Sequence, residues 1–430
     1  MSSAKVTIWN TTVGYLTWDE SNNAAVFEPD PDYLKANFNL SPVLHANKEE
    51  FLYGFDFHTR FEGMIPLFND SLPDSFGNIV FKEWAEHQNL NTRKINPVER
   101  LLYTGHGGIG ALEYHVSKKI HSAESELNPE ELALISDQII KGEYHHADYL
   151  LNPKALQNIL SIGSSVGGAQ AKVLLAIVGE ENSGEQKFLA GDQGYTGPAD
   201  YFIVKLEHDR QNLWSREKNR VEFVYNQMAR NAGINVAESR LIFHADRVHF
   251  ASKRFDRVNN QKLHKQTVNA LTGFFGRNNE FGYEDIFRIM AFLKLPYPQQ
   301  EQLFLQMTFN VLASNRDDHT KNFSFLMNPG GQWSLSPAYD LTYPLDPYQS
   351  FDIPHKISIN QKVNSIQKSD LQAVARKVGI KRHNELIERV ATSVQEFTNL
   401  AAQQDISRKT IHLIGKEIAR NLSVCFGGRV

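Results

Sequence analysis

Cysteine is nearly missing from this chain of 430 residues, where Cys425 is the single one. One thiol excludes an internal disulfide and argues against a metal site built from cysteines. The opening residues, Met1 to Lys5, have no apolar core of the kind that a signal peptide needs. No apolar run reaches the length of about 20 residues that a membrane-spanning helix requires. We therefore expect a cytoplasmic protein that does not enter a membrane.

An excess of charge of one sign is also missing. The chain has 45 Lys and Arg against 49 Asp and Glu, and its formal net charge is −4. This balance argues against a surface that coats nucleic acid, although a local basic patch could still contact phosphates. A solvated helix face is the commoner explanation for such a patch, and one candidate is formed by Lys362, Lys368, Arg376, Lys377, Lys381 and Arg382.

The polar stretch 315–322 organises the second half of the chain. The apolar spacing over 298–314 predicts a helix before it, and strong turn residues predict a β-hairpin over 323–335. A hairpin brings its two open ends together. We therefore expect Asn322, at one end, and Asp340, just past the other, to converge on one cation.

The spacing of the acidic and amide side chains in this stretch matches a catalytic loop. Asp317 precedes Asn322 by five residues, as in protein kinases, where the aspartate orients the acceptor hydroxyl and the asparagine holds Mg²⁺. A later aspartate, here Asp340, holds the metal that bridges the phosphates. Two protein oxygens are enough, because Mg²⁺ keeps waters and phosphate oxygens as its other ligands. The simpler interpretation is a polar loop that caps a hairpin, since Asp and Asn are ordinary turn residues.

Other kinase elements precede this loop in the expected order. The apolar run 201–206 predicts a buried strand that carries Lys205, where a kinase holds the α- and β-phosphates. An edge lysine reaching solvent is the alternative. The helical pattern of 221–232 carries Glu222, which could pair with Lys205. Residues 253–257 then fall where the hinge of a two-lobed kinase would contact adenine.

Two glycine-rich stretches invite a nucleotide-binding interpretation. Gly105, Gly107 and Gly110 fit G-x-G-x-x-G, but the pattern predicts a helix before them and a strand after them. A dinucleotide site requires the opposite order, so we predict a structural turn. The small residues of 165–172 could cradle phosphate oxygens with their backbone amides, and a flexible hairpin is the alternative.

The chain as a whole resembles the HipA toxin kinases of bacterial type II toxin–antitoxin pairs. The stretches that carry the resemblance occur in family order: 70–74, 107–113, 165–172, 254–257, 317–324 and 337–340. The resemblance implies an α/β (α+β), two-lobed protein-kinase-like fold. It places an additional β-rich N-terminal subdomain at residues 1–115, a mixed N-terminal lobe at 116–256 and a mainly helical C-terminal lobe at 257–430.

The resemblance also implies an activity and partners. Members of the family are serine/threonine-protein kinases that use ATP and Mg²⁺, phosphorylate proteins, in known members aminoacyl-tRNA synthetases, and arrest growth. A dimeric helix-turn-helix antitoxin, HipB, neutralises them and makes most of the contact with operator DNA.

Site residues follow by position. Asp317 falls on the catalytic aspartate, and Asn322 and Asp340 fall on the Mg²⁺ ligands. Ser165 falls on the autophosphorylated serine, whose dianionic phosphate would compete for the cations that ATP needs. Glu222 is the expected partner of Lys205. The full set expected to bind ATP is Gly167, Gly168, Ala169, Gln170, Ala171, Lys172, Lys205, Lys253, Arg254, Phe255, His319, Thr320, Lys321, Asn322 and Asp340.

The chain departs from the family pattern at four positions. Gly167 and Ala171 replace Ala and Glu, Lys253 stands where glutamate is common, and Asp318 stands where a small residue is common. These departures leave substrate choice open. Two other functions stay in view: a kinase for a small molecule, and a catalytically idle subunit that stabilises a repressor on DNA.

Overall fold

The computed structural model describes residues 2–73, 75–87, 90–92, 95–105, 107–115, 128, 132–133, 135–136, 170–179, 187–191, 199–207, 212–244, 246–258, 261–274, 280–349 and 353–427. Its N-terminal part is an antiparallel sheet in the order β4-β3-β2-β1-β5. The strands are β1 (Ser3–Ile8), β2 (Thr11–Asp19), β3 (Ala24–Pro29), β4 (Leu52–Tyr53) and β5 (Leu112–His115). Short helices surround the sheet: α1 (Pro31–Lys35), η1 (Phe55–Phe57), α2 (His58–Phe61), α3 (Pro66–Asn69) and α5 (Pro97–Thr104).

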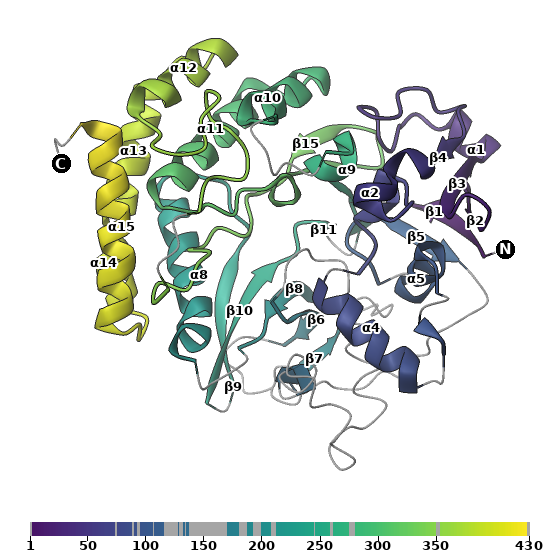
Figure 1. Cartoon of the computed structure of the whole chain (residues 1–430), viewed down its shortest axis with the longest axis horizontal. Coiled ribbons are helices and arrows are strands. Elements are labelled where there is room, and N and C mark those ends of the chain that lie inside the picture. The colour runs from purple at the N-terminus through teal and green to yellow at the C-terminus, as the bar shows by residue number, and fades with distance from the viewer. Residues whose placement is uncertain are drawn as a thin grey trace.

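A second antiparallel sheet, in the order β7-β6-β8-β10-β9, forms the middle of the molecule (Figure 1). Its strands are β6 (Lys172–Val178), β7 (Lys187–Ala190), β8 (Asp200–Lys205), β9 (Ser239–His244) and β10 (Arg247–Lys253). Helix α4 (Ser75–His87) shares a hydrophobic core with β6 and β8. Helix α8 (Leu213–Asn231) packs against β9 and β10.

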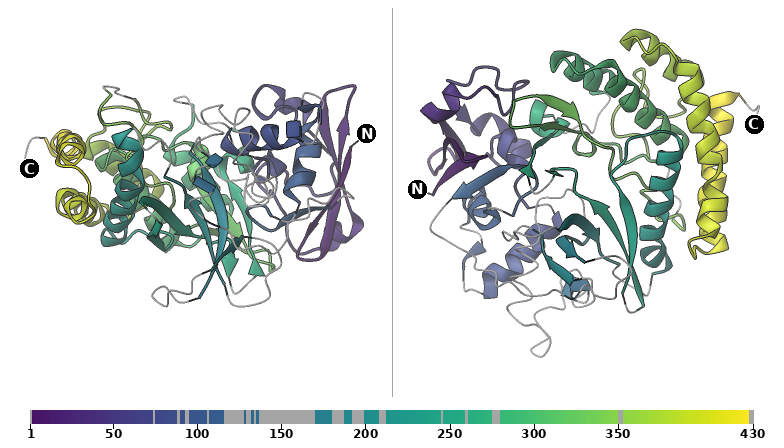
Figure 2. Two further views of the ribbon diagram at one scale, coloured as in Figure 1. Left: turned by 90° about the horizontal axis from the view of Figure 1, so that it is seen from below. Right: turned by 180° about the vertical axis from the view of Figure 1, so that it is seen from behind.

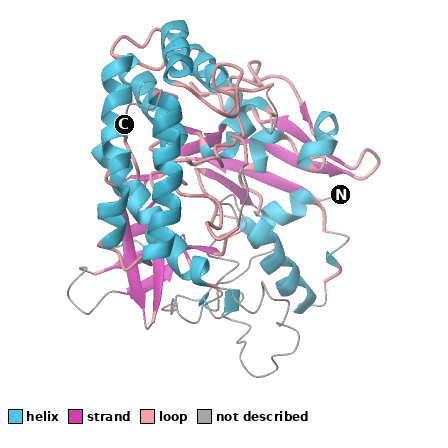
Figure 3. Cartoon of the chain, turned by 60° about the vertical axis from the view of Figure 1, so that its left-hand side comes forward, coloured by secondary structure: helices cyan, strands magenta, loops and turns pink. Residues whose placement is uncertain are grey.

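The rest of the chain is mainly helical, and its last helices, over residues 383–426, lie on the side of α8 away from the N-terminal sheet (Figures 1 and 2). Its helices are α10 (Tyr283–Phe292), α11 (Tyr297–Leu312), α12 (Lys368–Val378), α13 (His383–Gln395), α14 (Phe397–Ala402) and α15 (Arg408–Phe426). They gather on one side of the molecule (Figure 3). No helix among the described residues is long and apolar enough to cross a bilayer.

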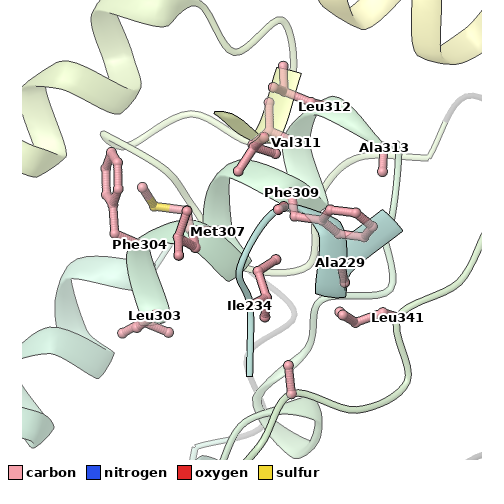
Figure 4. Close-up of a cluster of buried hydrophobic side chains, with 14 of the residues drawn as sticks. Ala229, Ile234, Leu303, Phe304, Met307, Phe309, Val311, Leu312, Ala313 and Leu341 are labelled. Atoms are coloured by element: carbon pink, nitrogen blue, oxygen red, sulfur yellow. The ribbon is translucent and has the colours of Figure 1, made fainter. Parts of the chain in front are cut away.

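The largest hydrophobic core joins α8 to these helices. Side chains of α11, such as Phe309, lie beside Ala229, Ile234 and Leu341 (Figure 4). Tyr225 of α8 contacts Phe309 edge-on, with ring centroids 6.0 Å apart, so α8 is part of the interior of the helical region.

A small third sheet carries the polar stretch. The predicted hairpin is confirmed as β14 (Ser324–Met327) and β15 (Trp333–Leu335), and it gains an outer strand, β13 (His264–Thr267). The helix η4 (Thr320–Asn322) precedes β14, and α9 (Val268–Thr272) follows β13. A two-stranded ribbon, β11 (Arg257–Val258) and β12 (Gln261–Lys262), leads into β13.

The α/β kinase-like fold with a β-rich N-terminal part is as the sequence predicts, and one predicted helix has a different start. Helix α8 begins eight residues before the predicted start at Val221, because polar residues in its first turns are buried and hydrogen-bonded. Asn219, for example, donates to the carbonyls of Lys205 and Val248 at 3.2 and 3.0 Å. Near the C-terminus, Glu396 separates α13 from α14. The domain boundaries stay a prediction.

The glycine-rich turn before β5 has a structural role, as the helix-then-strand order predicts, and it is bonded to the segment after β10. The buried Asp256 carboxylate accepts bonds from Arg254 (2.8 Å), Arg257 (2.7 Å) and the amide of Gly110 (2.7 Å). Both arginines also donate to the Gly108 carbonyl, at 3.1 and 3.2 Å. Burial alone would raise the pKa of Asp256, but the two guanidinium groups hold it below its usual range. We call these five residues the clasp, since they tie the N-terminal part to the segment after β10.

Replacing Asp256 by Asn should destabilise the protein strongly. The change leaves two buried guanidinium groups without their carboxylate, which costs about 3–5 kcal/mol in comparable sites. Urea denaturation followed by circular dichroism measures it. Asp200→Asn, at an exposed pair with Lys253, is the matched control and should cost less than about 1 kcal/mol. Equal effects of the two variants would contradict the role of the clasp.

The stabilisation that Asp256 provides should also depend on pH. Because the folded pKa of Asp256 is depressed, its stabilisation is present above the ordinary aspartate pKa of 3.8 and is lost as the pH falls through the folded pKa. The difference in unfolding free energy between wild type and Asp256→Asn should therefore shrink between pH 6 and pH 3. A constant difference over that range would show that the charge of Asp256 does not stabilise the fold.

Candidate functional site

A buried lysine with two carboxylate partners forms the centre of the site. Lys205 is the last residue of β8, and its Nζ lies 2.6 Å from Oε1 of Glu222 on α8 and 2.6 Å from Oδ1 of Asp340. Burial alone would lower the pKa of Lys205, but Asp340 and Glu222 raise it above its usual value. The lysine therefore stays a cation, as a phosphate clamp requires.

The second lysine at this point is Lys172, which lies directly opposite Lys205 in the pairing of β6 with β8. Burial raises the pKa of Asp340, but Lys205 and then Lys172 more than offset it, and the pKa is held below its ordinary value. Asp340 is thus an anion flanked by two cations. Its backbone is in the left-handed region, with φ of 52°. This conformation is uncommon for a residue other than glycine and accompanies functional turns.

The loop from α11 to β14 places Asp317 and Asn322 together. The side-chain amide of Asn322 donates from Nδ2 to the carbonyl of Asp317 at 2.7 Å, so its Oδ1 is the end directed away from that carbonyl. The Asp317 side chain is half exposed, at 49%. Burial raises its pKa, nearby His319 opposes the rise, and Asp340 adds to it. A raised pKa suits a group that accepts a proton from a hydroxyl.

A cavity of about 230 Å³ connects these groups. Its walls come from the central sheet, α8, the segment after β10, the third sheet with the turns beside it, and the N-terminal part. Lys205, Glu222, Asn322 and Asp340 line it. Asp317 is not one of the lining residues, and its backbone carbonyl is bonded to the lining residue Asn322. The remaining lining residues include Arg60, Glu62, Asn69, Asp70, Asn78, Arg100, Ile203, Phe250, Ser252, Arg254, Phe255, Lys265, Thr267, Lys321 and Tyr339.

One wall of the cavity was not foreseen from the sequence. Tyr339 contacts Phe255 with ring centroids 5.6 Å apart, and Nζ of Lys265 lies 5.3 Å from the Tyr339 ring centroid. Asp70 accepts bonds from the backbone and side chain of Thr267, at 2.7 and 2.9 Å, and so attaches the N-terminal part beside this wall. Aromatic rings with a nearby lysine suit a nucleotide, which has a flat base and anionic phosphates.

The expected glycine loop is not placed by the structure. Ser165, Gly167, Gly168 and Ala169 lie outside the described residues. The end of that stretch is described, and it joins the central sheet. Gln170 donates to Asn219 at 2.9 Å, Ala171 accepts from the amide of Leu206 at 2.9 Å, and Lys172 begins β6.

The other loop residues have mixed positions. Lys321 lines the cavity, whereas Thr320 donates from Oγ1 to the carbonyl of Phe274 at 3.0 Å. His319 accepts from the amide of Lys321 at 3.3 Å and thereby caps η4. Their roles toward ATP stay predictions.

Residues 253–255, the expected adenine hinge, contact the central sheet and the clasp, and their role toward adenine stays a prediction. Nζ of Lys253 lies 2.8 Å from Asp200, and its amide donates to the carbonyl of Glu238 at 2.7 Å. The amide of Arg254 donates to Tyr201 at 2.7 Å, and its guanidinium belongs to the clasp. Among residues 253–255, Phe255 is therefore the best placed for contact with a base.

The donor set fits a hard divalent cation. Asn322 and Asp340 offer oxygen ligands at the cavity, and Mg²⁺ prefers such ligands together with waters and phosphate oxygens. Within the described part of the chain there is no group of three or more His, Cys, Asp or Glu that could hold a metal alone. A cation here would thus depend on the phosphates of a nucleotide.

Fold and site together define a two-lobed, kinase-like protein with an added N-terminal domain. Models of two families match the chain: the HipA N-terminal domain at residues 4–115 and the HipA-like C-terminal domain at residues 164–398. Since the second match alone spans more than half of the residues, the chain belongs to the HipA family.

Two relatives illustrate the likeness. The serine/threonine-protein kinase toxin HipA of Shewanella oneidensis is 26% identical over 243 residues, which are 51% of this chain and 52% of that protein. The chain spans about half the length of the curated relatives it matches. A solved complex of Shewanella oneidensis MR-1 HipA, HipB and operator DNA contains a chain of the same fold. The TM-score is 0.65 at 16% identity, covering 98% of this chain and 96% of that one.

Substitutions of two lysines, one in the cavity and one at the surface, test which side chain binds the nucleotide. Lys205→Met should raise the Kd for Mg·ATP about 10- to 100-fold, since it removes charged hydrogen bonds to the phosphates. Lys253→Met should change the Kd less than about 3-fold, because its ammonium is engaged with Asp200 at the surface. Isothermal titration calorimetry measures both values. A large loss of affinity in Lys253→Met would restore that side chain to the nucleotide site.

Proposed function

We propose that this protein is a serine/threonine-protein kinase that uses Mg·ATP and phosphorylates a protein. The observation that carries the proposal is the contact of Lys205 with Asp340 at 2.6 Å, in a cavity that Asn322 also lines. The backbone carbonyl of Asp317 accepts the hydrogen bond of the Asn322 side chain, so Asp317 is the neighbour of a residue that lines this cavity. Phosphoryl transfer needs a cation that holds the phosphates, oxygen ligands for Mg²⁺ and a carboxylate that orients the acceptor hydroxyl.

Each part has a distinct task. Lys205 would hold the phosphates, while Glu222 fixes the direction of its ammonium. Bound Mg²⁺ would neutralise charge on the β- and γ-phosphates, with Asn322 and Asp340 as its protein ligands. Asp317 would accept the hydrogen bond of a serine or threonine hydroxyl and direct its oxygen at the γ-phosphate. Catalysis would come mainly from positioning and electrostatic stabilisation.

The partners are proposed from the family. The relative is named a serine/threonine-protein kinase toxin, and the solved complex contains HipB and operator DNA. We therefore propose a HipB-like helix-turn-helix antitoxin as the partner and an aminoacyl-tRNA synthetase as the substrate class, with growth arrest as the result. Autophosphorylation of Ser165 would switch the activity off.

The basic cluster near the C-terminus supports contact with DNA mainly through the antitoxin. Its cations face carboxylates: Lys362 lies 2.9 Å from Asp370, and Arg382 lies 3.9 Å from Glu301. Lys368 pairs with Glu388. A face neutralised in this way is a weak site for phosphates, since affinity for DNA grows with the number of cations that can replace counterions.

Asp317→Asn is the decisive variant for the activity. It should lower kcat for phosphate transfer about 10²- to 10⁴-fold while the Kd for Mg·ATP stays within about 3-fold, because Asp317 acts on the acceptor. Asp405→Asn, at an exposed left-handed turn that asparagine tolerates, is the matched control. Growth arrest on expression should disappear with Asp317→Asn and persist with Asp405→Asn. Arrest that persists in both would favour an idle, scaffolding subunit.

Transfer of labelled phosphate in a cell lysate distinguishes the substrate classes. With [γ-³²P]ATP, the protein kinase should label protein bands that Asp317→Asn leaves unlabelled. Label confined to small metabolites would replace this proposal with a small-molecule kinase.

A further inference from the structure

The residue after the candidate catalytic aspartate is held by a segment far along the chain. Asp318 accepts the amide of Lys356 on Oδ1 at 2.8 Å, and Nδ1 of His355 lies 2.8 Å from its Oδ2. Both contacts come from residues 353–356, which follow Asp340 and which we call the clamp segment. The side chains of Asp318 and His355 are buried, at 0% and 5% exposure. A buried carboxylate with side-chain and backbone partners on another segment limits the conformations of its own loop.

The residue before Asp317 is held by the same segment. Arg316 donates from Nη1 to the carbonyl of Ile353 at 2.9 Å and from Nη2 to Glu417 at 3.1 Å. The clamp segment thus holds the loop on both sides of Asp317. Asp317 itself has a looser side-chain contact, 3.8 Å to His319, so its direction depends on the backbone that its neighbours fix.

A buried polar chain continues from Asp318 to the metal-ligand turn. Tyr283 donates to Oδ2 of Asp318 at 2.9 Å and accepts from Asn310 at 2.9 Å. Asn310 accepts from Asn315 at 3.0 Å, and Asn315 also donates to the carbonyl of Asp340 at 3.4 Å. This chain of hydrogen bonds thus ends at the backbone carbonyl of Asp340, through its longest contact, and does not include the Asp340 carboxylate.

We propose that Asp318 is a positioning residue that sets the direction of Asp317 by fastening the catalytic loop to the clamp segment. The proposal rests on the proposed kinase function, because it assigns Asp318 to the acceptor side of that site. It separates Asp318 from the nucleotide side: Asp318 does not line the cavity, whereas Lys205 and Asp340 do. Loss of Asp318 should therefore lower kcat and leave nucleotide binding intact.

The test compares Asp318→Asn, His355→Gln and the double variant with wild type. Transfer from ATP to myelin basic protein gives kcat and KM, and a fluorescent ATP analogue gives affinity. Each single variant should lower kcat about 10- to 100-fold, as a displacement of about 1 Å does, with KM for ATP within about 3-fold. The double variant should be no worse than the poorer single variant, because both changes break one contact.

Hydrogen–deuterium exchange tests whether Asp318 holds the loop around Asp317 to the clamp segment, and it does not rely on activity. In Asp318→Asn, amides of 315–322 and of 353–358 should exchange faster together, while α11 keeps its protection. The matched control is Asp346→Asn, in the same stretch after Asp340, where the carboxylate accepts bonds within its own turn from Tyr348 and Gln349. It should leave both kcat and the exchange of 315–322 as in wild type.

The outcomes are separable. Unchanged kcat, additive effects in the double variant, or unchanged exchange of 315–322 in a folded Asp318→Asn protein would each overturn the positioning role. So would an equal loss of kcat, affinity and global stability. If wild type transfers no phosphate, the proposed function fails, and the exchange measurement alone decides whether Asp318 fastens the two segments.

Discussion

The ion contacts of Lys205 are the constraint on which the arrangement of this molecule depends. The contact with Asp340 joins residues 135 positions apart, and the contact with Glu222 adds helix α8. A buried ammonium without partners would be costly, and so would two neighbouring carboxylates without a cation. The three groups therefore stabilise one another only when the central sheet, α8 and the turn after β15 meet. This is the same meeting that creates the cavity, so folding and assembly of the site are one event.

The N-terminal part takes a direct share in that cavity. Asp70 is bonded to Thr267, and the clasp ties the glycine turn to the segment after β10. Arg60, Glu62 and Arg100 line the cavity from this side. A minimal kinase needs two lobes to enclose a nucleotide. Here a third unit closes part of the wall, which offers a physical reason for keeping it in the same chain.

The features that could be predicted from the sequence are those that depend on residues close together along the chain. The hairpin, the turn before β5 and the strand ending in Lys205 follow from short-range periodicity and turn chemistry, and the order of kinase elements links Lys205 to Glu222 and Asp340. The clasp, the Asp70 contact and the Lys265–Tyr339 wall could not be predicted in this way. The partners in the first two lie 146 and 197 residues apart, and the third joins strand β13 to the turn after β15. Strand β13 is a short polar sequence, His-Lys-Gln-Thr, with no apolar alternation. The role of Lys253 toward adenine stays a prediction, and the contact of its ammonium with Asp200 is a feature that its place in the chain did not indicate.

The loop around Asp317 shows why a departure from a family pattern can be informative. A small residue after the catalytic aspartate could not reach the clamp segment, whereas Asp318 reaches both His355 and the amide of Lys356. Through Tyr283, Asn310 and Asn315 the same carboxylate is connected to the carbonyl of Asp340. Hydrogen bonds in such a buried chain depend on one another, because each unpaired group would be costly in a low dielectric. The loop that carries Asp317 and the turn that carries Asp340 are therefore joined by one buried network that runs from the Asp318 carboxylate to the Asp340 backbone.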